Sequence, residues 1–318
     1  MKILFVCFSY SIHAARWVSL LRGTGWDVHV FPSQDFDAFH GEFRDVTYWP
    51  AKPDAFLPQP GIRVERASPV LLARAAGTLD HAQYLRRLVA EGGFDAVHSL
   101  EMQHAGYLTL DAVQGLTNRP QWIATNYGSD IFLFGERPEH RVRLRELLAR
   151  CDFYSAECVR DVRLAVDLGF SGRLFEVCPN GGGIDLAECA PRRSPLPPSR
   201  RRTIAVKGYE HFAGRALTVL GVLESLAGRL RGYRVVVHSA SPAVREAAVS
   251  LARRTGLRIE CLDDQVPHAA ILALHGQARI SIANSLSDGI STALIEASSM
   301  LVSIPLPKQI VPARSICT

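Results

Sequence analysis

Strand-like and helix-like patterns alternate along the chain from its first residues, and this alternation limits the fold more than any other feature. A run of β-branched and aromatic residues, 2–8, is followed by a helical pattern over 13–24, and the same order recurs. Parallel βαβ units require such alternation, so we predict an α/β fold. The other strands expected in the first half are 26–31, 62–67, 96–100, 121–127, 152–157 and 174–177, and the other helices are 78–91, 102–114, 139–150 and 158–168.

A segment rich in proline and arginine, residues 186–202, separates the first half from the second. It holds four prolines and five arginines, and turn formers combined with like charges disfavour regular structure. We predict a linker there, between an N-terminal domain of residues 1–185 and a C-terminal domain of residues 203–318. The arginines fit solvated linker charge better than a phosphate or lipid patch.

The alternating pattern restarts after the linker. The expected strands are 203–207, 233–239, 257–262 and 279–283, and the expected helices are 214–230, 242–255, 267–276 and 291–300. The sequence therefore predicts two doubly wound domains in succession. Such sheets bind ligands at the carboxyl ends of their strands, so two facing domains would hold a ligand between them.

Composition and charge exclude several classes of protein. The chain has 318 residues, of which 47% are hydrophobic and 21% charged, and this balance excludes disordered and fibrous proteins. Its net charge of +5 is too small to indicate nucleic-acid binding. Its apolar runs are shorter than the ~18 residues of a membrane helix. The seven cysteines include no Cys-x-x-Cys pair, so we expect reduced thiols in a cytoplasmic protein without a metal.

The most informative stretch is residues 285–297, Ser-Leu-Ser-Asp-Gly-Ile-Ser-Thr-Ala-Leu-Ile-Glu-Ala, which follows an expected strand. It places Asp288 in a loop and Glu296 two turns into the next helix. Carboxylates accept sugar hydroxyls, and the free N–H groups of a helix N-terminus bind anions. The pattern fits a ligand that carries both hydroxyls and phosphates, and it also fits ordinary helix capping.

This stretch resembles the Glu-x7-Glu motif of the retaining glycosyltransferases of family 4, which have the two-Rossmann GT-B fold. Asp288 stands at the first acidic position of that motif and Glu296 at the second. Further segments resemble the family in order and spacing: Pro179-Asn180-Gly181 to Asp185, Asn126-Tyr127-Gly128-Ser129-Asp130, Lys207-Gly208 and Gly214-Arg215.

The resemblance implies a donor site for a nucleotide diphosphate sugar. Asp288 would contact hydroxyls of the donor sugar and Glu296 the nucleotide ribose. The loop amides of Gly289, Ile290 and Ser291 would face the sugar or the phosphates. Basic side chains would replace a metal ion on the diphosphate, and the candidates are Lys207 and Arg215. Both also fit a simpler interpretation as solvated charges at a strand end and a helix end.

On the acceptor side the resemblance implies roles for Asn126 and Asp130. His13 is a further acceptor-side candidate, because it follows the first strand in the loop where a Rossmann domain presents its ligand. That loop contains no glycine, which disfavours a nicotinamide oxidoreductase with its Gly-x-Gly-x-x-Gly turn. His13 fits capping or packing equally well. Asn126 cannot titrate, so we expect it to position a hydroxyl, with Asp130 orienting it or capping the next segment.

Three further polar residues, His98, Glu101 and His104, have a spacing that suggests a metal cluster. Their place at a strand end and a helix start fits the lining of a cleft better.

The expected pattern of the second domain breaks off near residue 300. Pro305, Pro307 and Pro312 forbid a terminal helix in the tail. We expect a truncated or frameshifted gene and an incomplete second domain.

The sequence thus predicts a glycosyltransferase that moves a hexose from a nucleotide diphosphate sugar to a hydroxyl acceptor, a sugar or a lipid-linked sugar, with retention. We expect it in polysaccharide or glycolipid assembly, in the cytoplasm or peripherally on the inner membrane face, without a cofactor or a nucleic-acid partner. The alternative is a degenerate sugar-nucleotide-binding protein without turnover.

Overall fold

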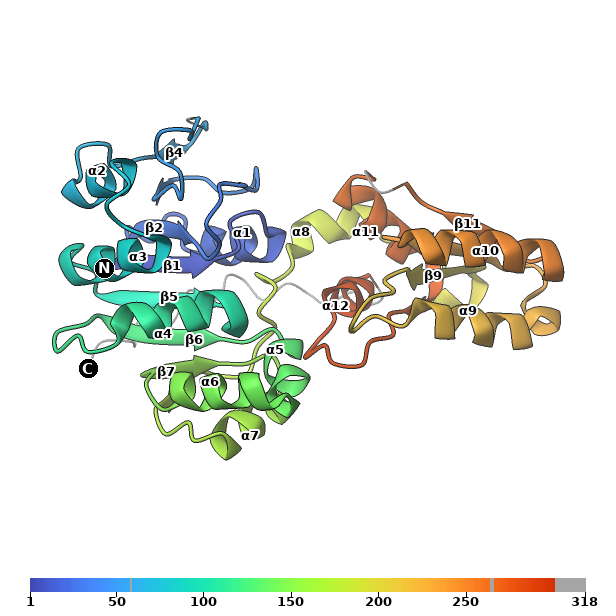
Figure 1. Cartoon of the computed structure of the whole chain (residues 1–318). Coiled ribbons are helices and arrows are strands. Elements are labelled where there is room, and N and C mark those ends of the chain that lie inside the picture. The colour runs from blue at the N-terminus through green and yellow to red at the C-terminus, as the bar shows by residue number, and fades with distance from the viewer. Residues whose placement is uncertain (58, 264–265, 301–318) are drawn as a thin grey trace. The chain divides into compact units, whose positions relative to one another are not determined.

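The computed structural model describes residues 1–57, 59–263 and 266–300 of the chain. They divide into two compact units, shown as ribbons in Figure 1. The first unit consists of Met1–Gly183 together with Ser285–Thr292, and the second begins at Ile184, runs to Asn284 and resumes at Ala293. The loop Ser285–Thr292, expected in the C-terminal domain, is therefore counted with the first unit.

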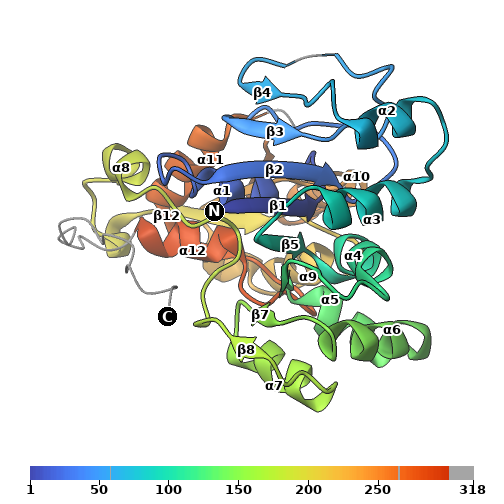
Figure 2. The same ribbon diagram turned by 90° about the vertical axis from the view of Figure 1, so that its left-hand side faces the viewer.

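Within the described residues, the first unit holds a sheet of eight parallel strands in the order β4-β3-β2-β1-β5-β6-β7-β8 (Figure 2). From β1 the chain adds β2 to β4 on one side and β5 to β8 on the other. The connections that follow β1 and β5 therefore leave the sheet in opposite directions. Ligands of open α/β sheets bind at such a switch point, outside the carboxyl ends of the strands. The strands are β1 (Lys2–Cys7), β2 (Asp27–Pro32), β3 (Val46–Tyr48), β4 (Ile62–Arg63), β5 (Ala96–Leu100), β6 (Gln121–Thr125), β7 (Phe153–Ser155) and β8 (Arg173–Leu174).

Helices cover both faces of this sheet because alternate residues of a strand point to opposite faces. In β1, Leu4 and Val6 pack into one apolar cluster with α3, α4 and α6, whereas Ile3 and Phe5 pack into another with α1. The helices of the first unit are α1 (Ile12–Ser19), α2 (Pro69–Ala75), α3 (His81–Glu91), the π-helix η1 (Met102–Gly106), α4 (Tyr107–Val113), α5 (Ser129–Phe132), the 3₁₀-helix η2 (Phe134–Glu136), α6 (Pro138–Leu148) and α7 (Val159–Asp167).

The second unit repeats this arrangement on a smaller scale. In the described residues its sheet has four parallel strands in the order β11-β10-β9-β12, so its switch point lies between β9 and β12. Its strands are β9 (Thr203–Lys207), β10 (Arg234–His238), β11 (Arg258–Cys261) and β12 (Ala278–Ile282). Its helices are α8 (Leu186–Cys189), η3 (Ala190–Arg192), η4 (Pro198–Arg200), α9 (Ala216–Ser225), η5 (Ala227–Leu230), α10 (Pro242–Thr255), α11 (His268–Gln277) and α12 (Thr292–Ser299).

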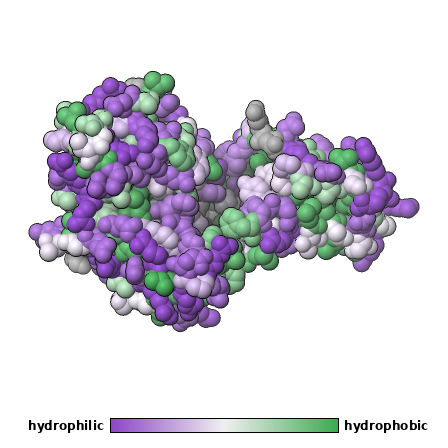
Figure 3. Space-filling view, in the orientation of Figure 1, coloured by the Kyte–Doolittle hydropathy of each residue, from purple (hydrophilic) through white to green (hydrophobic). Residues whose placement is uncertain are grey.

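The fold class predicted from the sequence is confirmed: both sheets are parallel and flanked by helices. The segment expected as a linker, 186–202, is not irregular throughout, since it holds the short helices α8, η3 and η4. The prolines on which the expected truncation rests lie in 301–318, outside the described residues. No helix in the described residues is long and apolar enough to cross a membrane, and the face of the first unit seen in Figure 3 is mostly hydrophilic.

Candidate functional site

Residues expected at the donor flank the switch point of the second unit. Lys207 ends β9, and its ammonium lies 4.6 Å from the ring centroid of Tyr209. On the other side of the switch point, β12 ends at Ile282 and is followed by the loop that carries Asp288. The chain then enters α12, which holds Glu296. The strand order thus places Lys207 and the segment that carries Asp288 and Glu296 after neighbouring strands, β9 and β12.

Arg215, the residue before α9, is engaged by its own loop. Its guanidinium donates to the backbone carbonyls of His211 and Gly214, at 2.6 and 2.7 Å, and lies 4.0 Å from the Glu210 carboxylate. A Cβ on Gly214 would lie 2.5 Å from the carbonyl oxygen of Tyr209. The glycine therefore allows this loop to close on itself.

Glu296 is the most firmly held of the expected donor residues. Its carboxylate is buried, and its Oε1 atom lies 2.7 Å from Nε2 of His268, the first residue of α11. A buried carboxylate is stable only when it is paired and hydrogen-bonded. The contact with His268 fixes Oε1, and because the carboxylate is rigid it also fixes the direction in which Oε2 points.

The loop 285–292 is shaped by local hydrogen bonds and by glycine. The Ser285 hydroxyl accepts from the amides of Ser287 and Asp288, at 3.3 and 3.2 Å. Gly289 packs so closely that a Cβ there would lie 2.6 Å from Oε2 of Glu157. Ser291 directly precedes α12, and its buried hydroxyl has no hydrogen-bond partner among the described residues. An unsatisfied buried hydroxyl at a helix start is a feature that a bound ligand would explain.

Asn126, expected at the acceptor, is instead part of the interior. Its side chain is fully buried; Nδ2 donates to Oδ2 of Asp161 at 2.8 Å, and Oδ1 accepts from the Tyr154 hydroxyl at 2.7 Å. Its backbone carbonyl accepts from Nδ2 of Asn180 at 3.0 Å. Both polar atoms of the Asn126 side chain are therefore used within the protein, and the structure brings it together with Asn180 of the expected Pro-Asn-Gly turn.

Asp130 and His13 also lie at the carboxyl edge of the first sheet. The Asp130 carboxylate is buried and accepts from the backbone amides of Tyr127 and Met102, so it ties the segment before α5 to the start of η1. Burial, reinforced by the nearby charge of Glu101, raises the pKa of Asp130 well above its usual range. His13 lies in the first turn of α1, where Ser11 and not His13 accepts from the helix amide. Its ring centroid is 6.4 Å from that of Tyr127.

The sequence did not single out Glu157, which follows β7 and joins this network. Its Oε1 accepts from the amide of Asn180 and its Oε2 from the amide of Ile290, both at 3.2 Å. Burial raises the pKa of Glu157 to about 7, while the two amide donors act in the opposite direction. A lone glutamate after a strand carries no pattern that would have identified it. Its partners come from two segments far away in the sequence.

We expect a specific pH dependence from Glu157. A carboxyl whose folded pKa of about 7 exceeds its ordinary value of 4.5 holds its proton more tightly in the folded state. Its contribution to the free energy of unfolding is therefore largest at low pH and declines as the pH rises from about 4.5 to about 7. Denaturant unfolding of the wild type and of Glu157→Gln at several pH values should show the wild type losing stability relative to the variant across that window. A constant difference between the two would contradict the assignment.

His98, Glu101 and His104 do not converge on a common point. The ring of His98 is buried with Nε2 2.7 Å from the Thr125 hydroxyl, and burial lowers its pKa to about 3. The Glu101 carboxylate accepts from the amides of residues 103–105. The hydrogen bond to Glu101 raises the pKa of His104. No group of three or more His, Cys, Asp or Glu side chains in the described part of the chain is arranged to hold a metal ion.

Two hollows lie away from these residues, at the amino-terminal ends of the strands. One, of about 650 Å³, is lined by Arg119, Asp152 and neighbouring residues of the first unit. The other, of about 700 Å³, is lined by Arg202, Arg234 and Arg258 with their neighbours in the second unit. Neither includes a residue of the expected donor or acceptor sites.

The sequence model of the glycosyl transferase 4-like family matches residues 2–160, which is half of the chain. No curated protein matches the sequence.

Solved structures share the fold. HepE of Anabaena, in complex with UDP-glucose, has a TM-score of 0.60 and 13% identity, over 94% of this chain and 78% of that one. An α,α-trehalose-phosphate synthase (UDP-forming) of Burkholderia vietnamiensis has a TM-score of 0.62 and 13% identity, over 94% and 82%. A trehalose-6-phosphate structure from E. coli, bound with UDP-2-fluoro glucose, has a TM-score of 0.61 and 12% identity, over 94% and 82%. At these identities the likeness shows the fold, two Rossmann-like domains of the GT-B type.

Proposed function

The chain belongs to the glycosyl transferase 4-like family, and on that premise we propose that it transfers a hexosyl group from a nucleotide diphosphate sugar to a hydroxyl group, with retention of configuration. The observation that carries the proposal is the buried Glu296 carboxylate, held by His268 beside the switch point of the second unit. That is where a doubly wound sheet binds its ligand. HepE was solved with UDP-glucose and the E. coli protein with a UDP-glucose analogue, which supports a hexose donor.

Each donor residue has a role in this proposal. Glu296 accepts hydroxyls of the ribose, and Asp288 accepts hydroxyls of the sugar. The amide of Gly289 and the unpartnered hydroxyl of Ser291 face the sugar or the phosphates, whereas the Ile290 amide, which the sequence also placed there, donates to Glu157. Positive charge from Lys207 stabilises the departing diphosphate without a metal ion. Arg215 joins it if its guanidinium exchanges the carbonyls of residues 211–214 for phosphate oxygens.

Proton transfer needs no titrating residue at position 126 in this proposal. The acceptor hydroxyl attacks the sugar on the same face from which the nucleoside diphosphate departs. An oxygen of the departing diphosphate takes the proton of that hydroxyl. Asn126 and Asp130 then act by holding the carboxyl edge of the first sheet in place, and His13 faces the acceptor from α1. Polysaccharide or glycolipid assembly, at the inner membrane face, is the setting that we propose.

The second candidate is a sugar-nucleotide-binding protein without turnover. The observation that favours it is the Arg215 guanidinium, which is bound to carbonyls of its own loop. Such a protein would bind a donor and leave it intact.

Calorimetric titration of the full chain with uridine and guanosine diphosphates and their hexose conjugates tests both candidates. We expect at least one sugar conjugate to bind. We also expect the chain to hydrolyse that conjugate slowly when no acceptor is present. Binding without any hydrolysis or transfer favours the second candidate. A folded chain that binds no nucleotide contradicts both.

Asp288→Asn separates sugar recognition from nucleotide recognition. A neutral amide accepts hydroxyl hydrogen bonds more weakly than a carboxylate, by about 1 kcal/mol or roughly fivefold in affinity. We expect the variant to lose affinity for the sugar conjugate and to keep its affinity for the free nucleoside diphosphate, measured in the same titration. An equal loss for both ligands would contradict this role for Asp288.

A further inference from the structure

Aromatic side chains from three loops meet at the switch point of the first unit. Phe8 and Tyr10 follow β1, Phe36 follows β2, and His104 lies in η1, which follows β5. Their rings form a connected row: the centroid distances are 5.9 Å from Phe36 to Tyr10, 5.4 Å from Tyr10 to Phe8 and 4.8 Å from Phe8 to His104. The row therefore crosses the carboxyl ends of β2, β1 and β5, where a doubly wound sheet places its ligand.

These rings are not packed into the core. The exposed fraction is 44% for Tyr10 and 45% for Phe36, and it is 48% for the side chain of His104. None of the four belongs to the two apolar clusters of the first unit, which hold buried aromatic residues such as Phe31 and Tyr48. Exposed apolar groups gathered at a ligand-binding edge indicate a binding surface more than isolated surface residues do.

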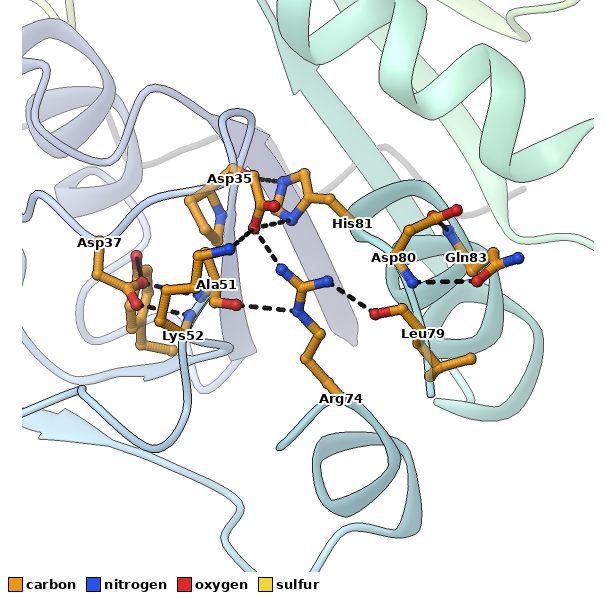
Figure 4. A network of polar contacts seen from close by, with 11 residues as sticks. Asp35, Asp37, Ala51, Lys52, Arg74, Leu79, Asp80, His81 and Gln83 are labelled. Carbon is orange, nitrogen blue, oxygen red and sulfur yellow. Dashed lines mark hydrogen bonds and ion pairs between the residues drawn. The ribbon is translucent and has the colours of Figure 1, made fainter. Parts of the chain in front are cut away.

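The loop that carries Phe36 is fixed on both sides of that residue (Figure 4). The Asp35 carboxylate contacts Arg74, lies 2.9 Å from the Lys52 ammonium and lies 3.6 Å from Nδ1 of His81. The Asp37 carboxylate accepts from the amides of residues 51 and 52, each at 2.8 Å, and from the Tyr48 hydroxyl at 2.8 Å. Because contacts within the protein hold the loop on both sides of Phe36, this residue would lose little conformational entropy on binding a ligand.

The opposite end of the row is polar. The Glu101 side chain is buried and accepts three backbone amides of η1, and its backbone has a φ of 90°, a left-handed value that is strained for a residue other than glycine. Strained backbone clusters at functional sites, and single-turn π-helices are also frequent there. Glu101 lies 3.4 Å from Nδ1 of His104, and this contact turns the opposite nitrogen, Nε2, away from the carboxylate.

We propose that the row Phe36, Tyr10, Phe8 and His104 is a subsite that binds a pyranose ring of the acceptor. A sugar ring has an apolar C–H face, which stacks on aromatic rings, and hydroxyls at its rim, which His104 reaches from the polar end. A lipid chain would need a wider apolar surface and would gain nothing from the pair formed by His104 and Glu101. The inference rests on the proposed function, since it names the acceptor class of the same enzyme.

Saturation-transfer NMR on the full chain tests the proposal, with the methyl glycosides of glucose, galactose and mannose as probes and with glycerol and hexanol as comparison compounds. We expect the ring C–H protons of at least one glycoside to receive saturation. Tyr10→Ala and Phe36→Ala should each reduce this signal about fivefold, the effect of losing one aromatic contact. Tyr10→Phe keeps the ring and should keep the signal. Leu72→Ala removes an exposed apolar side chain from α2 and should leave the signal unchanged.

Three results would overturn the subsite. They are the absence of signal from every glycoside with the folded wild type, glycoside signals that persist in Tyr10→Ala and Phe36→Ala, and a signal from hexanol without one from the glycosides. Nucleotide titration of the same variants keeps the two proposals apart. We expect donor affinity to be unchanged in them, and a wild type that binds glycosides but no nucleotide would contradict the proposed function while leaving the subsite in place.

Discussion

Glu296→Gln is expected to lower the affinity for a nucleoside diphosphate about 100-fold. A carboxylate offers each oxygen as an acceptor, so Oε1 can serve His268 while Oε2 serves the ribose. Glutamine has nearly the same shape but is neutral and replaces one accepting oxygen with an NH2 donor, so the ribose hydroxyls lose a charged acceptor. A hydrogen bond to a charged group contributes about 1.5–3 kcal/mol, and 3 kcal/mol corresponds to roughly 100-fold.

The design of this test depends on a matched control and a second ligand. Glu246→Gln removes a carboxylate from the exposed side of α10 in the same unit and should leave affinity unchanged. A dideoxyribose analogue lacks the hydroxyls that Glu296 would accept, so the wild type should bind it weakly and Glu296→Gln should bind it no worse than the wild type does. Equal affinity of the wild type and Glu296→Gln for the ribonucleotide would refute the role of Glu296.

His268 offers an independent measure of the same geometry. His268→Ala removes the partner that orients the Glu296 carboxylate but leaves the carboxylate itself. We therefore expect a smaller loss of ribonucleotide affinity, about tenfold, and little change for the dideoxy analogue. Titration of both ligands against the variant checks this, and an equal loss for both would indicate a structural role for His268 in place of a positioning one.

Much of the fold followed from local sequence patterns. The helix α10 was predicted with the bounds that the structure has, because proline begins it and glycine follows it. The strand β9 was predicted equally well from its apolar run. In contrast β3 was missed, since three residues are too few to show a period, and α2 was missed because its seven residues carry no clear amphipathic pattern.

The candidate site could be predicted only in part. The spacing of Asp288 and Glu296 is local, so the sequence displays it directly. The contact of Glu296 with His268 joins residues 28 positions apart, and the contact of Asn126 with Asp161 joins residues 35 apart. Whether a polar side chain faces a ligand or the interior depends on such partners. Their positions are set by the register of the sheet and not by neighbouring residues.

Asn126→Ala is expected to lower the free energy of unfolding of the first unit by about 3 kcal/mol. The substitution removes the Asn126 donor to Oδ2 of Asp161 and the nearer acceptor of the buried Tyr154 hydroxyl, which keeps only the Asp161 backbone carbonyl at 3.4 Å. An unsatisfied buried polar group costs about 1–3 kcal/mol, and more when it is charged. The remaining contact from Arg160 to Asp161 limits the loss. Were Asn126 a surface residue that touches the acceptor, the same change would reduce transfer and hardly affect stability.

Tryptophan fluorescence during denaturant unfolding measures this effect in the right unit, because all four tryptophans, at positions 17, 26, 49 and 122, belong to the first unit. Asn118→Ala changes an exposed asparagine of that unit and should stay within about 0.5 kcal/mol of the wild type. Asn126→Asp should destabilise more than Asn126→Ala at neutral pH, since it places a second carboxylate beside Asp161, and it should recover as the pH falls. An Asn126→Ala variant as stable as the wild type would contradict the interior role. It would support a role of Asn126 at the acceptor, because removing a side chain bonded to interior partners must lower the free energy of unfolding.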